Sequence, residues 1–219
     1  ILRLIHSGGS NYIAEICDML PSSLGGITSS VNSGRPKSRT TLGVHQAILS
    51  LLKSDGKNRI LDLGAGEGAL SEKLVSLGHN IIACDGDPQQ FKCAKVICQK
   101  TDLNANLPFS DSEFDVVILS DVIEHLENPW HTIRESHRIL RPGGKLIVSI
   151  PNILSIIARI HFLIHGEFLL FYRSKDEKLF PHITPLGYPL MEKILVGIGF
   201  KINRVLSNIP FIRECDEWD

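Results

Sequence analysis

Hydrophobic residues follow two different patterns along this chain. Runs of nearly continuous isoleucine, valine and leucine occur at 59–63, 80–85, 114–120 and 145–151, with a shorter run near 96–100. In the segments between them, apolar residues are spaced three or four positions apart, which is the period of an amphipathic helix. Continuous apolar strands that alternate with helices predict a parallel sheet with helices on both of its faces.

The N-terminal part of the chain carries further elements. Helical spacing predicts a short amphipathic helix at residues 10–20, and the glycine, serine and basic residues that follow predict a flexible segment. That segment is either a solvated loop or a cover over a ligand. We therefore divide the chain into residues 1–40, an N-terminal helix with a flexible cover segment, and residues 41–219, the main domain. Within the main domain, residues 152–185 form an insertion.

The composition of the chain limits what it can bind. Its 219 residues, 43% of them apolar, are enough for one sizeable core. A net charge of −1 gives no bulk electrostatic reason to bind nucleic acid or anionic lipid. The five cysteines are an odd number without a C-x-x-C pair, which argues against a disulfide framework or a zinc site and favours a reducing, cytoplasmic location. Neither a signal peptide nor a transmembrane span is expected.

The stretch ILDLGAGEGAL at 60–70 joins a buried strand to a helix through three glycines at alternate positions. Glycine lets the backbone approach a ligand closely, and the helix N-terminus behind the turn attracts negative charge. A P-loop would need a Lys-Ser or Lys-Thr pair after the glycines, and none follows here. The spacing Gly64-x-Gly66-x-x-Ala69, with Asp85 about 20 residues further on, does satisfy the loose dinucleotide fingerprint, so a nicotinamide cofactor stays open at this point.

Three further features separate these possibilities. Asp62 lies inside the strand just before the turn, where a pyrophosphate would meet a repulsive charge and an ammonium group an attractive one. Asp102 and Leu103 follow the third strand, and a Pro-Gly-Gly turn leads into the fifth. With these residues the chain resembles the class I S-adenosylmethionine-dependent methyltransferases. It carries their D-x-G-x-G-x-G, LPF…FDVV…EHL and L-[KR]-P-G-G signatures, in order, between about residues 41 and 206.

The resemblance implies a particular fold of the α/β class. It is a Rossmann-like, doubly wound sheet of seven strands in the order 3-2-1-4-5-7-6, with an antiparallel last strand and helices on both faces. The stretch FKINRVL at 200–206 would be the sixth strand. Only residues 207–219 remain for the seventh, which would be brief or truncated.

The resemblance also implies a function. It is methyl transfer from S-adenosyl-L-methionine to a small-molecule acceptor, with S-adenosyl-L-homocysteine as the product, and we favour O-methylation. The alternatives are an inactive relative that binds the ligand or scaffolds a partner, and an NAD-binding oxidoreductase. The residues that the family would use for the cofactor are, at the methionine end, Asp62, Gly64, Ala65, Gly66 and Ser120, at the ribose Asp85, and at the adenosine Gly86, Asp102 and Leu103.

The stretch SDVIEHLENP offers residues for the reaction itself. If a helix begins at residue 121, Asp121, Glu124 and His125 share one face beside the expected methyl group. Methyl transfer needs a base only where the acceptor must lose a proton. His125 is our candidate base, with Asp121 and the later His182 as further catalytic candidates. Alternatively, the two carboxylates only serve the helix N-terminus and the histidines make ordinary hydrogen bonds.

A metal site is a third hypothesis for this stretch. The D-x-x-E-H spacing resembles the E-x-x-E-H magnesium site of some quinone-biosynthesis O-methyltransferases and small-RNA 2′-O-methyltransferases, but Asp121 has a shorter arm than the glutamate it would replace. Magnesium also prefers ligand sets made of oxygen atoms. We therefore predict that no metal is bound.

Residues 151–190 depart most from a minimal domain. The run ILSIIARIHFLIHGEFLLFY is strongly apolar and follows the fifth strand, where related enzymes insert helices that cover the substrate. It would pack on the core, cover an acceptor or contact a membrane surface, although an interfacial helix usually has a face of lysine and arginine. An apolar cover favours a hydrophobic or glycan-lipid acceptor. A nucleic acid is disfavoured, because the chain has no stripe of aromatic and basic residues.

Overall fold

The computed structural model describes residues 12–19, 36–38, 40, 43–52, 56–171 and 182–207. Its strands are β1 (Tyr12–Met19), β2 (Arg59–Leu63), β3 (Asn80–Asp85), β4 (Ile97–Lys100), β5 (Phe114–Ser120), β6 (Leu140–Pro151) and β7 (Phe200–Ser207). Its α-helices are α1 (Val44–Leu52), α2 (Ala69–Ser76), α3 (Pro129–Ile139), α4 (Ile156–His165) and α5 (Tyr188–Ile198). Two short 3₁₀ helices, η1 (Pro88–Gln90) and η2 (Ile123–His125), lie in the connections.

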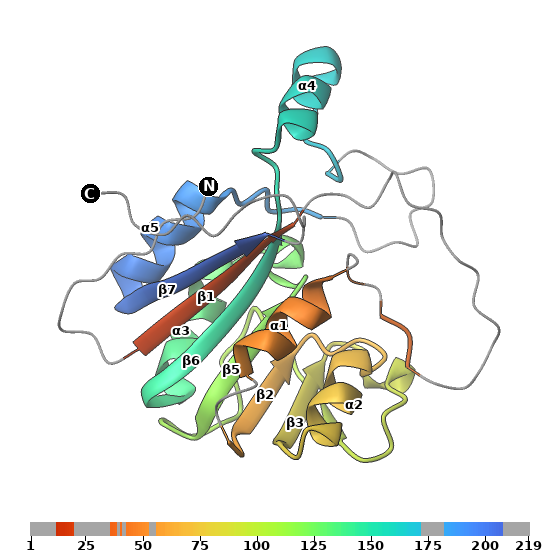
Figure 1. Ribbon diagram of the computed structural model, residues 1–219, viewed down its shortest axis with the longest axis vertical. Coiled ribbons are helices and arrows are strands. Elements are labelled where there is room, and N and C mark those ends of the chain that lie inside the picture. Colours follow the sequence, from red (N-terminus) through yellow and green to blue (C-terminus); the bar gives the residue numbers. More distant parts are fainter. Residues whose placement is uncertain are drawn as a thin grey trace.

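The strands form one sheet in the order β4-β3-β2-β5-β6-β1-β7, and each pairing between these described strands is parallel. Helices α1 and α2 cover one face of the sheet, and α3 and α5 cover the other (Figure 1). The predicted α/β, Rossmann-like fold class is therefore confirmed. Because the strands are parallel, their carboxyl ends meet at one edge, here called the carboxyl edge, where ligands bind in sheets of this kind.

Alternate side chains of the central strand β5 pack on opposite faces of the sheet. Val117 and Leu119 belong to an apolar cluster with α3 and α5, whereas Val116 and Ile118 belong to a second cluster with α1 and α2. All four side chains are buried. A strand that is buried on both faces needs apolar residues at every position, which explains the continuous runs in the sequence.

The helix predicted at residues 10–20 is wrong, because Tyr12–Met19 form strand β1. This strand pairs in parallel with β6 along one side and with β7 along the other. Pairing on both sides satisfies the backbone of β1, and such long-range contacts override a helical spacing of apolar residues. In the sheet, β1 occupies the place between β6 and β7 that the family order gives to an antiparallel seventh strand. Of residues 207–219, the predicted source of that strand, Ser207 ends β7 and the others lie outside the described residues.

Helix α4 lies within the predicted insertion at 152–185 and stands clear of the sheet at the carboxyl edge (Figure 1). The Ser155 side chain accepts a hydrogen bond from the Ala158 N–H, and Gly166 ends the helix in the left-handed conformation. These are the usual caps of an α-helix. Among the residues described, no helix is both long and apolar enough to cross a membrane.

Candidate active site

The glycine turn after β2 has two kinds of glycine. Gly64 has a φ of 73°, and a Cβ added to it would lie 2.3 Å from a methyl group of Val122, so packing requires glycine there. Gly66 has a φ of 55°, but a Cβ added to it would meet nothing within 4 Å. The N–H groups of Gly64 and Ala65 donate to the Cys84 carbonyl oxygen, at 2.8 and 3.0 Å. Hydrogen bonds thus fix the start of the turn, and the space above Gly66 is open.

Asp85, at the end of β3, faces this turn. Its carboxylate accepts hydrogen bonds from the N–H of Gly66 at 2.8 Å and from the N–H of Asp87 at 2.9 Å. The side chain is half-buried, so part of it remains accessible. The sequence predicts that Asp85 contacts a ligand on the turn. In the structure, the Asp85 carboxylate lies against the glycine turn.

Asp62 lies beneath the turn and is only 1% exposed. Its carboxylate accepts a hydrogen bond of 2.6 Å from the Ser71 hydroxyl of α2. Burial raises the pKa of Asp62 to about 6, against the opposing effect of the Ser71 hydrogen bond, and the charge of Asp85 raises it further. The structure therefore places this predicted site residue under the turn, in contact with α2.

The three residues predicted to line the adenosine side differ in their exposure and in their contacts. Asp102 is exposed, and its carboxylate accepts from the Asn104 N–H at 2.9 Å. Leu103 is buried, and its carbonyl oxygen accepts from the Thr132 hydroxyl at 2.7 Å. Gly86 is exposed, with open space where a Cβ would lie.

The end of β5 holds an isolated polar atom. The Ser120 hydroxyl oxygen is buried and has no hydrogen-bond partner among the described residues. A buried hydroxyl of this kind costs free energy unless something bonds to it, so it is a good candidate for ligand contact. Its neighbour Asp121 has a φ of 56°, which is rare for a residue other than glycine.

Residues 121–125 do not begin an α-helix, so the expected common helix face of Asp121, Glu124 and His125 does not form. Only the short 3₁₀ helix η2 forms there. The Asp121 carboxylate instead accepts from the Ser149 hydroxyl at 2.7 Å, and its N–H donates to the same oxygen at 2.9 Å. Ser149, which the sequence analysis did not single out, thus holds the chain in its unusual conformation after β5.

Glu124 and His125 are joined by His182, from a distant part of the chain. The rings of His125 and His182 have centroids 4.6 Å apart, and His182 Nε2 lies 4.0 Å from a carboxylate oxygen of Glu124. One ligand atom from each of the three residues lies within 4.8 Å of the other two. The structure brings Glu124, His125 and His182 together.

Backbone hydrogen bonds explain this meeting. The N–H groups of Ile183 and Thr184 donate to the Glu124 carbonyl oxygen at 2.8 and 3.0 Å, and the Thr184 hydroxyl donates to the Leu126 carbonyl oxygen. These bonds fix the segment that follows residue 181 against η2. The sequence contains no short motif for them, because they join backbone atoms almost 60 positions apart.

The electrostatics of this cluster favour uncharged forms. Burial, together with the charge of Asp121, raises the pKa of Glu124 well above its usual value. Burial lowers the pKa of His182 to about 4, and His125 contributes to that shift. Among the described residues, one carboxylate oxygen of Glu124 and Nδ1 of His182 have no hydrogen-bond partner. His182 is therefore neutral at pH 7 and able to accept a proton or bind a cation.

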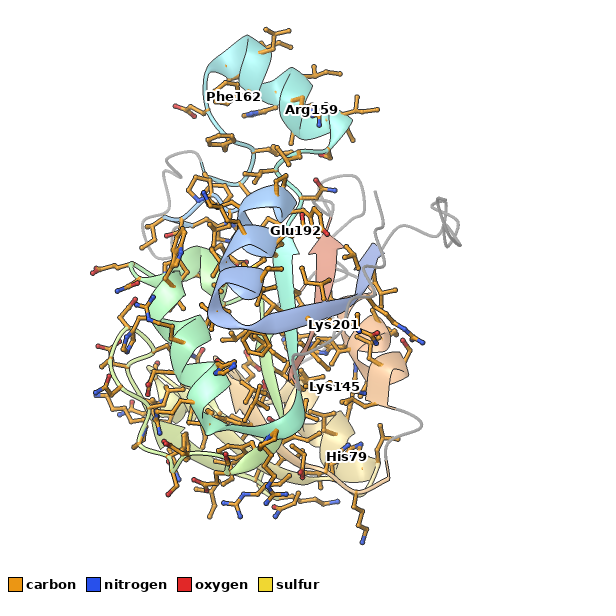
Figure 2. All side chains as sticks on the ribbon, turned by 90° about the vertical axis from the view of Figure 1, so that its left-hand side faces the viewer. His79, Lys145, Arg159, Phe162, Glu192 and Lys201 are labelled. Carbon is orange, nitrogen blue, oxygen red and sulfur yellow. The ribbon has the colours of Figure 1, made fainter. Side chains whose placement is uncertain are left out.

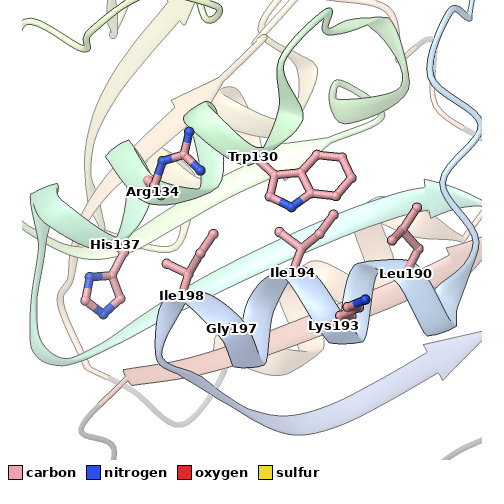
Figure 3. Close-up of a pocket in the computed structure, with 8 residues that line it drawn as sticks. All are labelled: Trp130, Arg134, His137, Leu190, Lys193, Ile194, Gly197 and Ile198. Carbon is pink, nitrogen blue, oxygen red and sulfur yellow. The ribbon is translucent and has the colours of Figure 1, made fainter.

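A separate groove of about 720 Å³ lies between α3 and α5 (Figure 3). Trp130 and Ile194 line it, with Lys193 at its side. None of the residues predicted for the cofactor or the reaction lines this groove. It belongs to the helical layer on one face of the sheet, so we do not assign the acceptor to it.

Comparison with known proteins shows which methyltransferases this chain is similar to. Residues 61–148 match the family model described as a methyltransferase domain. The ubiquinone biosynthesis O-methyltransferase of Parvibaculum lavamentivorans is 29% identical over 171 residues, which cover 73% of this chain and 65% of that relative. The enzyme of the same name from Cereibacter sphaeroides is 32% identical over 102 residues, covering 43% of this chain and 41% of the relative. A solved SAM-dependent methyltransferase from Thermotoga maritima has a TM-score of 0.57 at 21% identity, with 73% and 70% of the two chains covered.

A parallel sheet with a glycine turn at its carboxyl edge defines a Rossmann-like, cofactor-binding domain. The matched stretch 61–148 contains that turn, Asp85 and the end of β5. The chain is therefore similar to class I S-adenosylmethionine-dependent methyltransferases, and S-adenosylmethionine is the cofactor of that class. The chain spans less than two thirds of the length of the curated relatives named above. At 21% identity, the structural likeness shows the fold alone.

Proposed function

We propose that this protein transfers a methyl group from S-adenosylmethionine to an oxygen atom of a small-molecule acceptor. The observation that carries the proposal is the open space above Gly66, which faces the Asp85 carboxylate at the carboxyl edge. Calorimetry tests it directly: S-adenosylhomocysteine should bind and NAD should not. Binding of NAD alone would refute the proposal and would favour an oxidoreductase.

The cofactor would lie across the carboxyl edge. Its methionine end would lie over Gly64, Ala65 and Gly66, with Asp62 beneath them and the unpartnered Ser120 hydroxyl beside them. The ribose hydroxyls would donate to Asp85, whose carboxylate is already fixed by two backbone N–H groups. The exposed Gly86 and Asp102, with Leu103, would contact the adenosine.

The acceptor would lie beside His125 and His182. Methyl transfer is an in-line displacement at a sulfonium centre, so the protein mainly has to align the two reactants and exclude water. The leaving thioether is neutral and needs no proton. An acceptor hydroxyl does lose a proton, and the imidazole of His125 would take it, with His182 packed against its ring.

A second candidate uses a divalent cation at the same place. The unpartnered atoms of Glu124 and His182, with His125 nearby, are a chemically suitable donor set. One carboxylate and two imidazoles suit a transition metal better than magnesium. A cation held there would lower the pKa of an acceptor hydroxyl and so supply the same deprotonation.

The surroundings of His182 favour an apolar acceptor. The Phe171 ring packs against His182 with the centroids 5.1 Å apart, and Phe168 packs against Phe171 at 6.4 Å. Aromatic side chains beside the reacting groups bind apolar or aromatic parts of a ligand and exclude water. A hydrophobic or glycan-lipid acceptor therefore stays our proposal, and a cytoplasmic location remains a prediction.

Replacing Asp85 by alanine should weaken S-adenosylhomocysteine binding at least about tenfold, as measured by calorimetry. Two ribose hydroxyls that donate to a carboxylate form charge-assisted hydrogen bonds, each worth roughly 1.5–3 kcal/mol. Asp87→Ala is the matched control, because Asp87 lies two residues away, is exposed and has a carboxylate that accepts from the Gln89 N–H. If Asp87→Ala weakens binding and Asp85→Ala does not, Asp87 is the ribose ligand.

Replacing Asp62 by asparagine should stabilise the fold at pH 7 while weakening cofactor binding. The folded-state pKa of Asp62 is raised to about 6, so its contribution to stability is full below about pH 4 and is lost as the pH rises through 6. Asparagine keeps an acceptor for Ser71 without the buried charge, and the gain in unfolding free energy should be on the order of 1–3 kcal/mol. Urea unfolding at pH 4 and pH 7 checks this, and a variant less stable than the wild type at pH 7 contradicts it.

A further inference from the structure

Helix α4 exposes a continuous apolar stripe to the surroundings. Ile156, Ile160, Leu163 and Ile164 recur at positions i, i+4, i+7 and i+8 of the helix, and their exposed fractions are 76, 52, 85 and 68%. Folded domains rarely leave a contiguous apolar patch in water unless it contacts a protein, a ligand or a membrane. We therefore expect this stripe to contact an apolar surface of a protein, a ligand or a membrane.

The helix gains little from the rest of the domain. Of its ten residues, only Ala158 is buried. Isolated helices of this length are marginal in water, and isoleucine is not among the best helix formers. An apolar medium would stabilise α4 in two ways, by taking up the stripe and by strengthening its backbone hydrogen bonds.

The shape of α4 narrows the choice of contact. It projects from the carboxyl edge as a convex element, with Arg159 and Phe162 at the end of the molecule (Figures 1 and 2). A small ligand needs a concave site. A ten-residue helix is about 15 Å long and about 10 Å wide, so α4 alone offers roughly 150 Å² to a second copy of the chain, against the roughly 800 Å² per partner of a stable dimer.

The charges on α4 suit a lipid surface. Residues 156–165 contain no aspartate or glutamate, and their ionisable side chains are Arg159, His161 and His165. Arg159 is exposed, and the rings of the two histidines lie 4.6 Å apart. A helix with an apolar stripe, an exposed arginine and no acidic side chain can lie at the boundary between lipid headgroups and acyl chains without charge repulsion from anionic lipid.

We propose that α4 docks the protein on a lipid bilayer by inserting its apolar stripe into the interfacial region. Ten residues are too few to span the bilayer, so the helix lies on it. The rings of Phe162 and Phe168, 4.8 Å apart, continue through Phe171 to His182, which joins the docking helix to the candidate active site. Docking does not depend on the proposed methyl transfer, although it would bring a membrane-dissolved acceptor to that site.

Flotation of the full chain with unilamellar vesicles of phosphatidylcholine and phosphatidylglycerol tests the proposal. The wild-type protein should float with the vesicles. The double variant Leu163→Ser with Ile164→Ser should bind about a hundredfold more weakly, because each large apolar side chain contributes roughly a factor of ten to transfer out of water. Ile97→Ser is the matched control, since Ile97 is 75% exposed on strand β4, away from α4, and should leave binding unchanged.

Three outcomes would overturn the proposal. One is a wild-type protein that stays in solution with vesicles of this composition. Another is an equal loss of binding in the Ile97→Ser control. The third is a wild-type dimer that the double variant dissociates, without any vesicle binding, in sedimentation velocity. Circular dichroism of each variant, together with S-adenosylhomocysteine binding, shows whether the domain itself is intact.

Discussion

Replacing Gly66 by valine should abolish binding of S-adenosylhomocysteine while the protein still folds. A Cβ at this position would meet no protein atom within 4 Å, so the added side chain enters the space that we assign to the ligand. The residue also has a φ of 55°, which a branched side chain strains. Both effects oppose the bound turn, and we expect at least about a hundredfold loss of affinity, or roughly 2.7 kcal/mol.

Gly56 provides a control that separates the effect of backbone strain from the effect of a side chain that fills the ligand's space. It has a φ of 64°, and a Cβ added to it would also meet nothing within 4 Å, but it precedes β2 and so lies at the opposite edge of the sheet. Gly56→Val and Gly66→Val should therefore show similar losses of unfolding free energy. Only Gly66→Val should lose the ligand in calorimetry. Equal, undiminished binding in both variants would mean that the cofactor does not lie on this turn.

The core of the fold could be predicted because its signal is local. In β5, residues 116–119 face alternate sides of the sheet and are all apolar, and this pattern is visible in a few consecutive letters. Strand β1 carries no such signal, since Ile13, Ile16 and Cys17 also fit the spacing of a helix. Its conformation depends on pairing with β6 and β7, which come from the other half of the chain.

The candidate site also combines features that the sequence predicts with features that depend on distant contacts. The turn at Gly64 and Gly66 could be predicted, because both positions have a positive φ, which favours glycine, and the close contact with Val122 requires glycine at Gly64. The α-helix expected to begin at Asp121 was wrong, since the hydrogen bonds with Ser149 hold a different conformation there. The approach of His182 to His125 depends on two backbone hydrogen bonds to Glu124. Such bonds do not require particular residue types, so the sequence does not reveal them.

The pair of histidines allows the two candidate mechanisms to be told apart. If His125 is the base, His125→Ala should lower the rate of methyl transfer by about 10²–10⁴-fold, which is the usual cost of losing a general base. Binding of S-adenosylhomocysteine should stay nearly unchanged, because no cofactor contact is assigned to His125. His79→Ala is the control, since His79 lies at the far end of the molecule (Figure 2) and should affect stability alone.

The pH dependence of the rate has a defined sign. A base must be unprotonated, so the rate should fall as the pH drops through the pKa of the catalytic group. The fold itself also weakens in acid. The pKa of His182 is lowered to about 4, so the stability that this residue contributes is present above pH 6.5 and is lost as the pH falls from 6.5 towards 4. Rates must therefore be compared with the folded fraction, measured by fluorescence at each pH.

A chelator decides between the base and the cation. With His125 as the base, EDTA should leave the wild-type rate unchanged, and Glu124→Gln should cost far less than His125→Ala. With a divalent cation, EDTA should abolish activity and an added transition metal restore it, and Glu124→Gln should be as damaging as His125→Ala, because a carboxamide is a poor replacement for a charged ligand. We expect the first result. Activity that EDTA removes and a metal ion restores would instead assign the buried Glu124, with both histidines, to a metal centre.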